Sequence, residues 1–164
     1  MANLYLVIGV PCSGKSTFLK KYVNKNCVIV SFDDIKTKIV GNKKLFFNSK
    51  ETKKVFDIFY KTINDNLQKN KTVFVESNIL TFNLRKEILK NITAEYKKLF
   101  AVYIKTPFKF CSIRNKNRSE LKRFPEYFML NVYKIFDPPQ LYEGFYGIYT
   151  YDTITKKFSY QGTL

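Results

Sequence analysis

The stretch from Gly9 to Thr17 reads Gly-Val-Pro-Cys-Ser-Gly-Lys-Ser-Thr. It matches Gly-x-x-x-x-Gly-Lys-Ser, the Walker A pattern whose backbone wraps nucleotide phosphates. An apolar run at 4–8 precedes it, as expected of a buried parallel strand. The residues at 17–23 have apolar side chains at helical spacing. This strand–loop–helix order is the context that the motif requires, and it predicts a P-loop fold.

The loop has the residues needed to hold a nucleoside triphosphate. Its glycines let successive N–H groups face a phosphate, and the positive end of the following helix adds to the attraction. Lys15 can reach the β- and γ-phosphates, and the Ser16 hydroxyl is predicted to bind Mg²⁺. The predicted nucleotide-binding residues of the loop are Gly9, Pro11, Cys12, Ser13, Gly14, Lys15, Ser16 and Thr17.

Apolar runs alternate with amphipathic stretches along the rest of the chain. Further strands are expected at 27–31, 72–76, 99–104 and, as a strand or hairpin, about 147–160. Helices are expected at 15–24, 50–69 and 84–92. A short helix is expected to end at about Val40, two more are expected to begin at 107 and 125, and a basic loop is expected at 42–49. This alternation predicts one domain over 1–164, an α/β fold with a three-layer parallel sheet of the P-loop NTPase/kinase type. A helical lid is expected at about 107–125.

Two aspartates follow the second apolar run. Asp33 and Asp34 are expected at the carboxyl edge of the sheet, where the phosphate-binding loop also lies. A carboxylate there can accept the proton of an attacking hydroxyl group and aim that group at the γ-phosphate. The chain has no histidine to take this role. The alternative is that one of the aspartates only caps the helix expected near Ile35.

A second acidic group ends the strand expected at 72–76. Glu76 is followed by Ser77 and Asn78. These residues are predicted to orient the acceptor, or to hold Mg²⁺ through water. The alternative is that Glu76 is a solvated carboxylate at a strand end.

Two arginines lie in the region of the expected lid. Arg114 and Arg118 are four residues apart, which would place them on one face of a helix that begins at Pro107. The polar stretch 119–124 follows them. This pattern is typical of a lid whose arginines close over phosphates and stabilise the transferring phosphoryl group. The alternative is an exposed basic helix in an already basic protein.

The net charge of +16 is far from ordinary for 164 residues. It favours a polyanionic partner, such as nucleic acid or an acidic membrane face, although an AT-rich genome would also enrich lysine. Three widely spaced cysteines suggest a reducing compartment. Because there is no signal peptide and no apolar run of about 18 residues, we expect no membrane span and a cytoplasmic or other intracellular location.

The ordered set of motifs resembles the kinase domain of polynucleotide 5′-kinases, both the bacteriophage enzymes and the kinase half of eukaryotic polynucleotide kinase/phosphatase. The resemblance covers about residues 3–150. The matching segments are 9–19, Val-Ser-Phe-Asp-Asp at 30–34, Val-Glu-Ser-Asn at 75–78, Arg-Asn-Lys-Asn-Arg at 114–118, and 133–145.

The resemblance implies an ATP-dependent kinase that phosphorylates the 5′-hydroxyl end of DNA or RNA, with Asp33 as the general base. The catalytic residues that it implies are Asp33, Lys15, Arg118 and Arg114, and both arginines also contact ATP. The predicted substrate-binding residues are Asp34, Lys36, Glu76, Ser77, Asn78 and Arg85.

The chain departs from the family in three places. Phe32 stands where the family often has arginine, Lys36 stands where the phage enzymes have arginine, and Glu76-Ser77-Asn78 replaces Asp-Thr-Asn or Asn-Thr-Asn. These departures affect the expected acceptor preference more than the chemistry. No Asp-x-Asp-x-Thr or Lys-x-Asp-Gly motif occurs, so a separate phosphatase and ligase are expected partners.

Two other functions fit the same motifs. A small-molecule or nucleoside kinase needs the same loop, carboxylate and arginines, and only its acceptor differs. An NTP-gated nucleic-acid-binding module would need no general base, so Asp33 and the two arginines argue against it.

Overall fold

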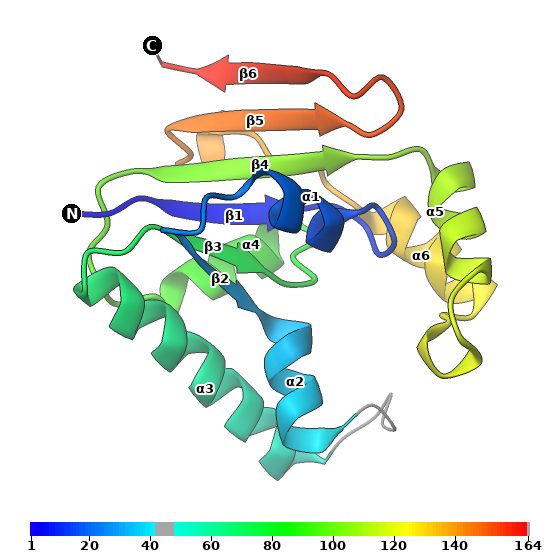
Figure 1. Ribbon diagram of the computed structural model, residues 1–164, viewed down its shortest axis with the longest axis horizontal. Helices are drawn as coiled ribbons and strands as arrows, with labels where there is room; N and C mark the ends of the chain where they lie inside the picture. Colours follow the sequence, from blue (N-terminus) through cyan, green and yellow to red (C-terminus); the bar gives the residue numbers. More distant parts are fainter. Residues whose placement is uncertain (42–47, 164) are drawn as a thin grey trace.

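Six strands form one sheet in the order β2-β3-β1-β4-β5-β6 (Figure 1). The computed structural model describes residues 1–41 and 48–163, so most of the basic loop predicted at 42–49 lies outside the described residues. The strands are β1 (Leu4–Ile8), β2 (Val28–Ser31), β3 (Val73–Glu76), β4 (Leu99–Lys105), β5 (Gly147–Asp152) and β6 (Phe158–Gly162). All neighbouring strands are parallel except β5 and β6, which form an antiparallel hairpin.

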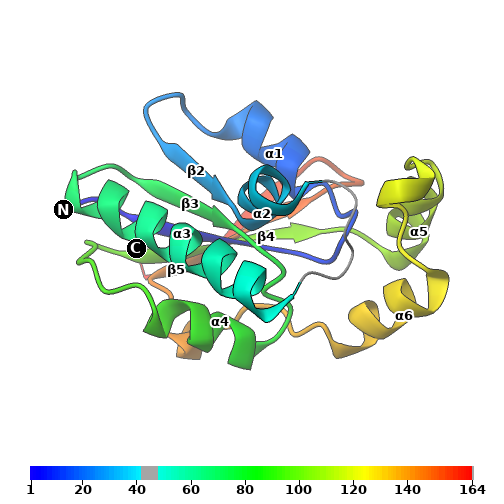
Figure 2. The same ribbon diagram turned by 90° about the horizontal axis from the view of Figure 1, so that it is seen from below.

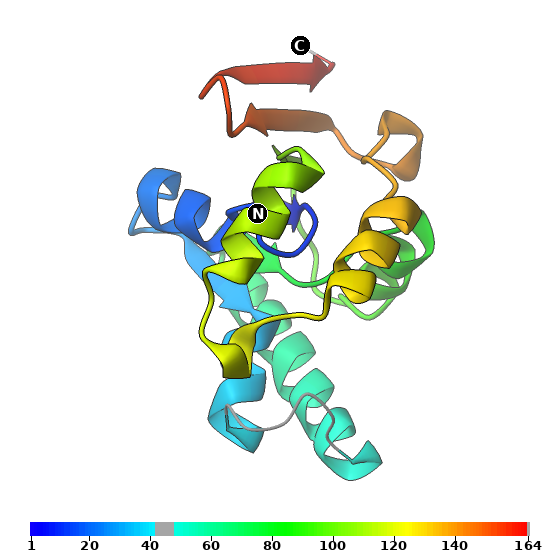
Figure 3. The ribbon, with the colours of Figure 1, turned by 90° about the vertical axis from the view of Figure 1, so that its right-hand side faces the viewer.

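The helices lie on both faces of this sheet and at its carboxyl edge. They are α1 (Lys15–Tyr22), α2 (Phe32–Val40), α3 (Ser49–Gln68), α4 (Phe82–Lys90), α5 (Phe108–Lys116) and α6 (Glu126–Ile135), with short 3-10 turns at Glu120–Lys122 and Leu141–Glu143. Figures 2 and 3 show α1 on one side of the sheet and α4 on the other. The predicted three-layer α/β architecture is therefore confirmed, with an antiparallel edge strand added to a parallel sheet.

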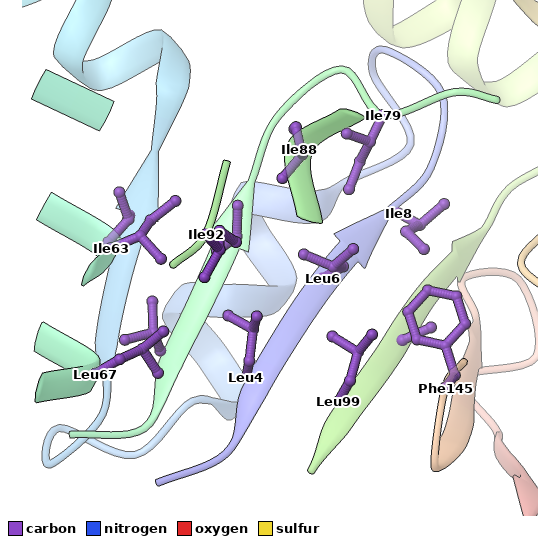
Figure 4. Close-up of a cluster of buried hydrophobic side chains, with 14 of the residues drawn as sticks. Leu4, Leu6, Ile8, Ile63, Leu67, Ile79, Ile88, Ile92, Leu99 and Phe145 are labelled. Carbon is purple, nitrogen blue, oxygen red and sulfur yellow. The ribbon is translucent and has the colours of Figure 1, made fainter. Parts of the chain in front are cut away.

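The main core lies between the sheet and α3 and α4. In β1, Leu4, Leu6 and Ile8 point into it and are fully buried (Figure 4). The helix α3 contributes a stripe of apolar residues at every fourth position, and it begins with a capping box between Asn48 and Glu51. The stripe is Val55, Phe59, Ile63 and Leu67. Full burial of each such side chain contributes about 1.5–3 kcal/mol to the free energy of unfolding. This packing holds α3 against the strands.

A smaller core lies on the opposite face, beneath α1. Phe18 and Leu19 of α1 pack there against Val7 of β1 and Val102 and Ile104 of β4. Among the described helices, α1 is the one that packs on this face (Figures 1 and 3). Because α1 begins directly after the Gly9–Gly14 loop, this packing fixes the loop at the carboxyl end of β1.

Two local expectations need correction. The second helix begins at Phe32 rather than near Ile35, and its N-cap is Ser31, whose hydroxyl accepts a hydrogen bond from the Asp34 amide. Neither aspartate is therefore the capping residue. The helix α5 ends at Lys116, so Arg118 lies in the loop after it and does not share a helical face with Arg114.

Within residues 1–41 and 48–163, no helix has the length and apolar character that crossing a bilayer requires.

Candidate nucleotide-binding and phosphoryl-transfer site

The loop between β1 and α1 has the curled backbone of a phosphate-binding loop. Gly14 adopts a left-handed conformation with φ of 103°, and Cys12 is also left-handed with φ of 63°. At Gly9, a Cβ atom would lie 2.8 Å from Ser13 Oγ and 2.9 Å from the Ile104 carbonyl oxygen, so this position has no room for a side chain. The loop leads directly into the N-terminus of α1, whose unpaired N–H groups and positive dipole end favour an anion.

Lys15 lies inside this loop and is 9% exposed. Its ammonium group donates hydrogen bonds to the carbonyl oxygens of Gly9 at 2.8 Å and Val10 at 3.2 Å. Burial lowers the pKa of Lys15, and the nearby carboxylates of Glu76 and Asp33 oppose that shift. A buried ammonium held by weak carbonyl acceptors gains strongly from an anionic partner.

Glu76 connects the loop to the adjacent strand. It ends β3, which pairs with β1 in parallel, and its Oε1 accepts a 2.7 Å hydrogen bond from Ser16 Oγ. A hydroxyl and a carboxylate are hard oxygen donors, which Mg²⁺ prefers, and Mg²⁺ is usually held by one or two such groups together with substrate phosphates. The donor set at Ser16 and Glu76 therefore fits Mg²⁺. No group of three or more acidic, cysteine or histidine ligands occurs among the described residues.

Asp33 faces the space around Lys15 and Glu76 from the β2 side of the sheet. It lies in the first turn of α2, directly after β2, which is two strands away from β1. Asp33 and Lys15 both line a cavity of about 300 Å³. Its lining residues are Pro11, Cys12, Gly14, Lys15, Ser16, Thr17, Asp33, Glu76, Ser77, Asn78, Arg114, Arg118 and Phe124.

The two arginines reach the phosphate-binding loop from the 107–125 segment. Arg114 Nη1 donates to the carbonyl oxygens of Ser13 at 2.8 Å and Cys12 at 3.2 Å. Arg118 Nη1 lies 3.6 Å from the Cys12 sulfur. The two side chains are brought together at the loop although Arg118 lies beyond the end of α5. Both add positive charge where phosphates would lie.

Phe124, which we did not identify from the sequence, holds Arg118 in place. The guanidinium carbon of Arg118 lies 5.2 Å from the centre of the Phe124 ring, and the Phe128 ring stacks on Phe124 with centres 5.1 Å apart. The buried side chain of Asn115 accepts a 2.9 Å hydrogen bond from the Phe124 amide and donates a 2.7 Å bond to its carbonyl oxygen. This clasp closes the loop from 116 to 123 and places Arg118 over the cavity.

A second cavity of about 300 Å³ opens on the other side of Arg114. It lies between α1 and the β5–β6 hairpin, and it shares Gly14, Thr17 and Arg114 with the first cavity. Its remaining lining residues are Ser13, Phe18, Lys21, Tyr22, Tyr151, Thr153 and Lys156. No sequence motif indicated this cavity, because its walls come from segments more than a hundred residues apart.

Not all of the predicted site residues line the first cavity. Gly9 and Ser13 form the loop behind it, and Lys36 is not among the residues that line either cavity. Asp34 lines a separate groove between β2, α2 and α3. These positions leave Asp33 as the aspartate of the pair that faces Lys15.

Arg85 requires a correction. Its side chain is 1% exposed and forms a bidentate ion pair with Glu143. Nε donates to Oε2 at 2.6 Å, and Nη2 donates to Oε1 at 2.7 Å. Its Nη1 also donates to the carbonyl oxygens of Asp137 and Ile79. The guanidinium group is committed to joining α4 to the 137–143 segment, so the structure contradicts a substrate-binding role for Arg85.

These features define a nucleotide-binding protein of the P-loop kinase-like class. Residues 4–132, which make up most of the chain, match the family model described as AAA domain. The chain therefore belongs to the AAA domain family. No protein in a search of curated sequences matches it.

Solved structures with a similar fold include kinases. A chain of the Pnkp1/Rnl/Hen1 RNA repair complex matches with a TM-score of 0.68 and 20% identity over 82% of this chain, and the match spans only 42% of that longer chain. Kti12 from Chaetomium thermophilum, in complex with ADP-AlF3, has a TM-score of 0.64 and 12% identity, covering 92% of this chain and 89% of that one. A sugar kinase from Janibacter sp. HTCC2649 has a TM-score of 0.59 and 12% identity, covering 85% and 80%. At such identities these similarities show the fold alone.

Proposed function

We propose that this protein is an ATP-dependent kinase that transfers the γ-phosphate of ATP to the 5′-hydroxyl end of DNA or RNA. The observation that carries the proposal is the position of Asp33, whose carboxylate lines the same cavity as Lys15, Arg114 and Arg118. A carboxylate opposite the phosphate-binding loop is suited to accept a proton from a hydroxyl acceptor.

In this mechanism, ATP lies across both cavities. The triphosphate binds the Gly9–Gly14 loop and Lys15, and the base and ribose occupy the second cavity beside Tyr22 and Tyr151. Ser16 and Glu76 would hold Mg²⁺, which supplies charge neutralisation at the β- and γ-phosphates when bound.

The transfer step uses Asp33 and the arginines. Asp33 accepts the proton of the 5′-hydroxyl group while the oxygen of that hydroxyl group bonds to the γ-phosphorus. The bond between the γ-phosphorus and the oxygen that bridges it to the β-phosphate breaks, and ADP is released. Arg118 and Lys15 stabilise the charge on the transferring group. Ser77 and Asn78 line the same cavity as Asp33 and would contact the acceptor.

Two further observations support a nucleic-acid acceptor. The net charge of +16 suits a polyanionic substrate. The Pnkp1 neighbour was solved in an RNA repair complex with Rnl and Hen1, which is consistent with a role in nucleic-acid repair alongside other proteins.

A kinase that acts on a small molecule is the second candidate, and the similarity to a sugar kinase favours it. The two functions are separated by measuring transfer of labelled γ-phosphate to 5′-hydroxyl DNA, 5′-hydroxyl RNA, nucleosides and sugars. We expect oligonucleotides to react best, a 5′-phosphorylated oligonucleotide not to react, and KM for oligonucleotides to rise steeply with salt. Faster reaction of nucleosides or sugars would favour the second candidate and overturn the first.

A further inference from the structure

Five aromatic side chains form a continuous row across the face of the sheet that carries α1. We call Tyr5, Phe74, Phe100, Tyr149 and Tyr160 the aromatic row. Tyr5 stacks between Phe74 and Phe100, with ring centres 4.4 and 4.9 Å away. Tyr149 continues the row, 5.8 Å from Phe100 and 4.8 Å from Tyr160. Ile29 extends it onto β2, since it pairs in register with Phe74.

The row is only partly covered. Tyr5 and Phe74 pack against the cluster beneath α1, and Phe100 is buried, whereas Tyr149 and Tyr160 lie beyond that cluster. Phe18 and Leu19 of α1 pack over Val7 and Val102, towards the carboxyl ends of the strands. Tyr149, Tyr160 and Ile29 remain 36%, 40% and 40% exposed. Figure 1 shows the amino-terminal half of this face without a helix in front of it. The exposed apolar surface therefore lies at the two ends of the row, at Ile29 on β2 and at Tyr149 and Tyr160 on the β5–β6 hairpin, and it offers a place for a further layer.

The segments around the row carry mainly positive charge. Asp152 and Glu76 lie at the carboxyl ends of β5 and β3, and Glu95 precedes Lys97 by two residues. Residues 1–32, 66–75, 96–119 and 153–164 contain no aspartate or glutamate. Lys71, Lys97 and Lys98 lie within three residues of the strands that carry Phe74 and Phe100. Lys98 also lies 3.5 Å above the Tyr146 ring. The surface therefore offers an apolar strip with a basic rim.

We propose that the aromatic row is the docking surface for an acidic amphipathic helix of another protein. The apolar face of such a helix would cover the row, and its glutamates or aspartates would meet the lysines of the rim. This site lies away from the proposed phosphoryl-transfer site, and the proposal does not depend on the acceptor of that reaction.

The ring geometry favours a helix over single-stranded nucleic acid. The planes of Tyr5 and Phe74 differ by 6°, and those of Tyr5 and Phe100 by 14°, so these rings cover one another's faces and present their edges outward. Bases stack on ring faces, and Tyr5, Phe74 and Phe100 turn their faces toward one another. A second copy of this chain would bring a like charge of +16 against the same basic rim.

The probe is a synthetic 18-residue helical peptide with leucine on one face and glutamate on the other, and its binding is measured by calorimetry. Comparison ligands are the same peptide with lysine in place of glutamate and a 12-nucleotide oligothymidylate. Row variants are Ile29→Lys and Tyr149→Lys. The control is Tyr142→Lys, which adds the same charge at a side chain that is 78% exposed and lies outside the row.

We expect the acidic peptide to bind and the basic peptide not to bind. Each row variant should weaken binding at least tenfold, while Tyr142→Lys changes it less than twofold and all three variants keep kinase activity. The proposal would be overturned if the acidic peptide did not bind, or if the row and control variants bound it equally. It would also be overturned if the row variants lost only the binding of oligothymidylate. A dimer in sedimentation that Tyr149→Lys dissociates would overturn it in favour of a second copy. If the row variants do not fold, nuclear magnetic resonance of the wild-type chain decides, because the peptide must shift signals of Tyr5, Phe74 and Tyr149.

Discussion

The hydroxyl group of Ser16 donates a 2.7 Å hydrogen bond to Oε1 of Glu76. This bond joins the first turn of α1 to the end of β3, and it brings together the two oxygen ligands proposed for Mg²⁺. Because β1 and β3 are parallel neighbours, their carboxyl ends deliver both groups to the same cavity.

Glu76→Gln should weaken the use of Mg²⁺ more than the binding of ATP. The amide keeps the size of the side chain but removes the negative charge that would hold the cation and that accepts the hydrogen bond from Ser16. Loss of such a group typically lowers metal affinity by about 10–100-fold. Titrating activity with Mg²⁺ should show this as a higher half-saturating concentration, with Kd for metal-free ATP nearly unchanged. An unchanged Mg²⁺ titration would remove Glu76 from the metal site.

Phe124→Ala should lower kcat and leave KM for ATP within about twofold. The ring holds the guanidinium group of Arg118, and a cation–π contact of this kind is worth about 0.5–2 kcal/mol, so a fall of about 2–30-fold is expected. Phe124→Tyr should retain kcat because it keeps the ring. Leu121→Ala, at a 71% exposed position in the same loop, is the matched control. A rise in KM with constant kcat would show that Phe124 binds a substrate and does not position Arg118.

Alkylation of the three cysteines should report nucleotide binding. Cys12 is half-buried in the phosphate-binding loop, Cys27 is half-buried at the start of β2, and Cys111 is buried. Burial also raises the pKa of Cys111 to about 11, so its thiol stays protonated and unreactive at pH 8. We expect iodoacetamide to modify Cys12 and Cys27 only, and ATP to slow modification of Cys12 at least tenfold. Equal protection of Cys27, which does not line the cavity, would point to a global change instead.

Arg85→Ala should reduce stability and leave the chemistry of the folded protein intact. It would leave the carboxylate of Glu143, 2% exposed, without its partner, and removing one member of a buried ion pair costs about 3–5 kcal/mol. Urea unfolding measures this loss in the free energy of unfolding. Lys53→Ala, which removes an exposed ion pair with Asp57, should change stability by less than about 1 kcal/mol. Wild-type stability with a raised KM for the acceptor would restore the substrate-binding role.

The sequence located the centre of the site because its signals are local. The Gly9–Thr17 pattern, the apolar run before it and the helix after it are contiguous, and parallel strands end at one edge. Asp33 and Glu76 could therefore be assigned to the edge that carries the loop, and the structure places both in one cavity.

Long-range contacts were beyond the reach of the sequence. Arg85 and its partner Glu143 are 58 positions apart, and nothing in the sequence near Arg85 reveals a buried carboxylate. The same holds for the second cavity, which combines α1 with the β5–β6 hairpin. Helical spacing suggested one face for Arg114 and Arg118, but α5 ends between them, and the clasp of Asn115 on Phe124 brings Arg118 back to the loop.

The most direct test of the account is phosphoryl transfer by Asp33→Asn. This substitution keeps the shape of the side chain and removes its ability to accept a proton. Transfer of labelled γ-phosphate to a 5′-hydroxyl oligonucleotide should fall by about 10²–10⁴-fold, while Kd for ATP changes less than about twofold. Asp34→Asn, at the neighbouring carboxylate that lines a different groove, should keep near-normal transfer. Full activity of Asp33→Asn, or loss of transfer only in Asp34→Asn, would contradict the central role of Asp33.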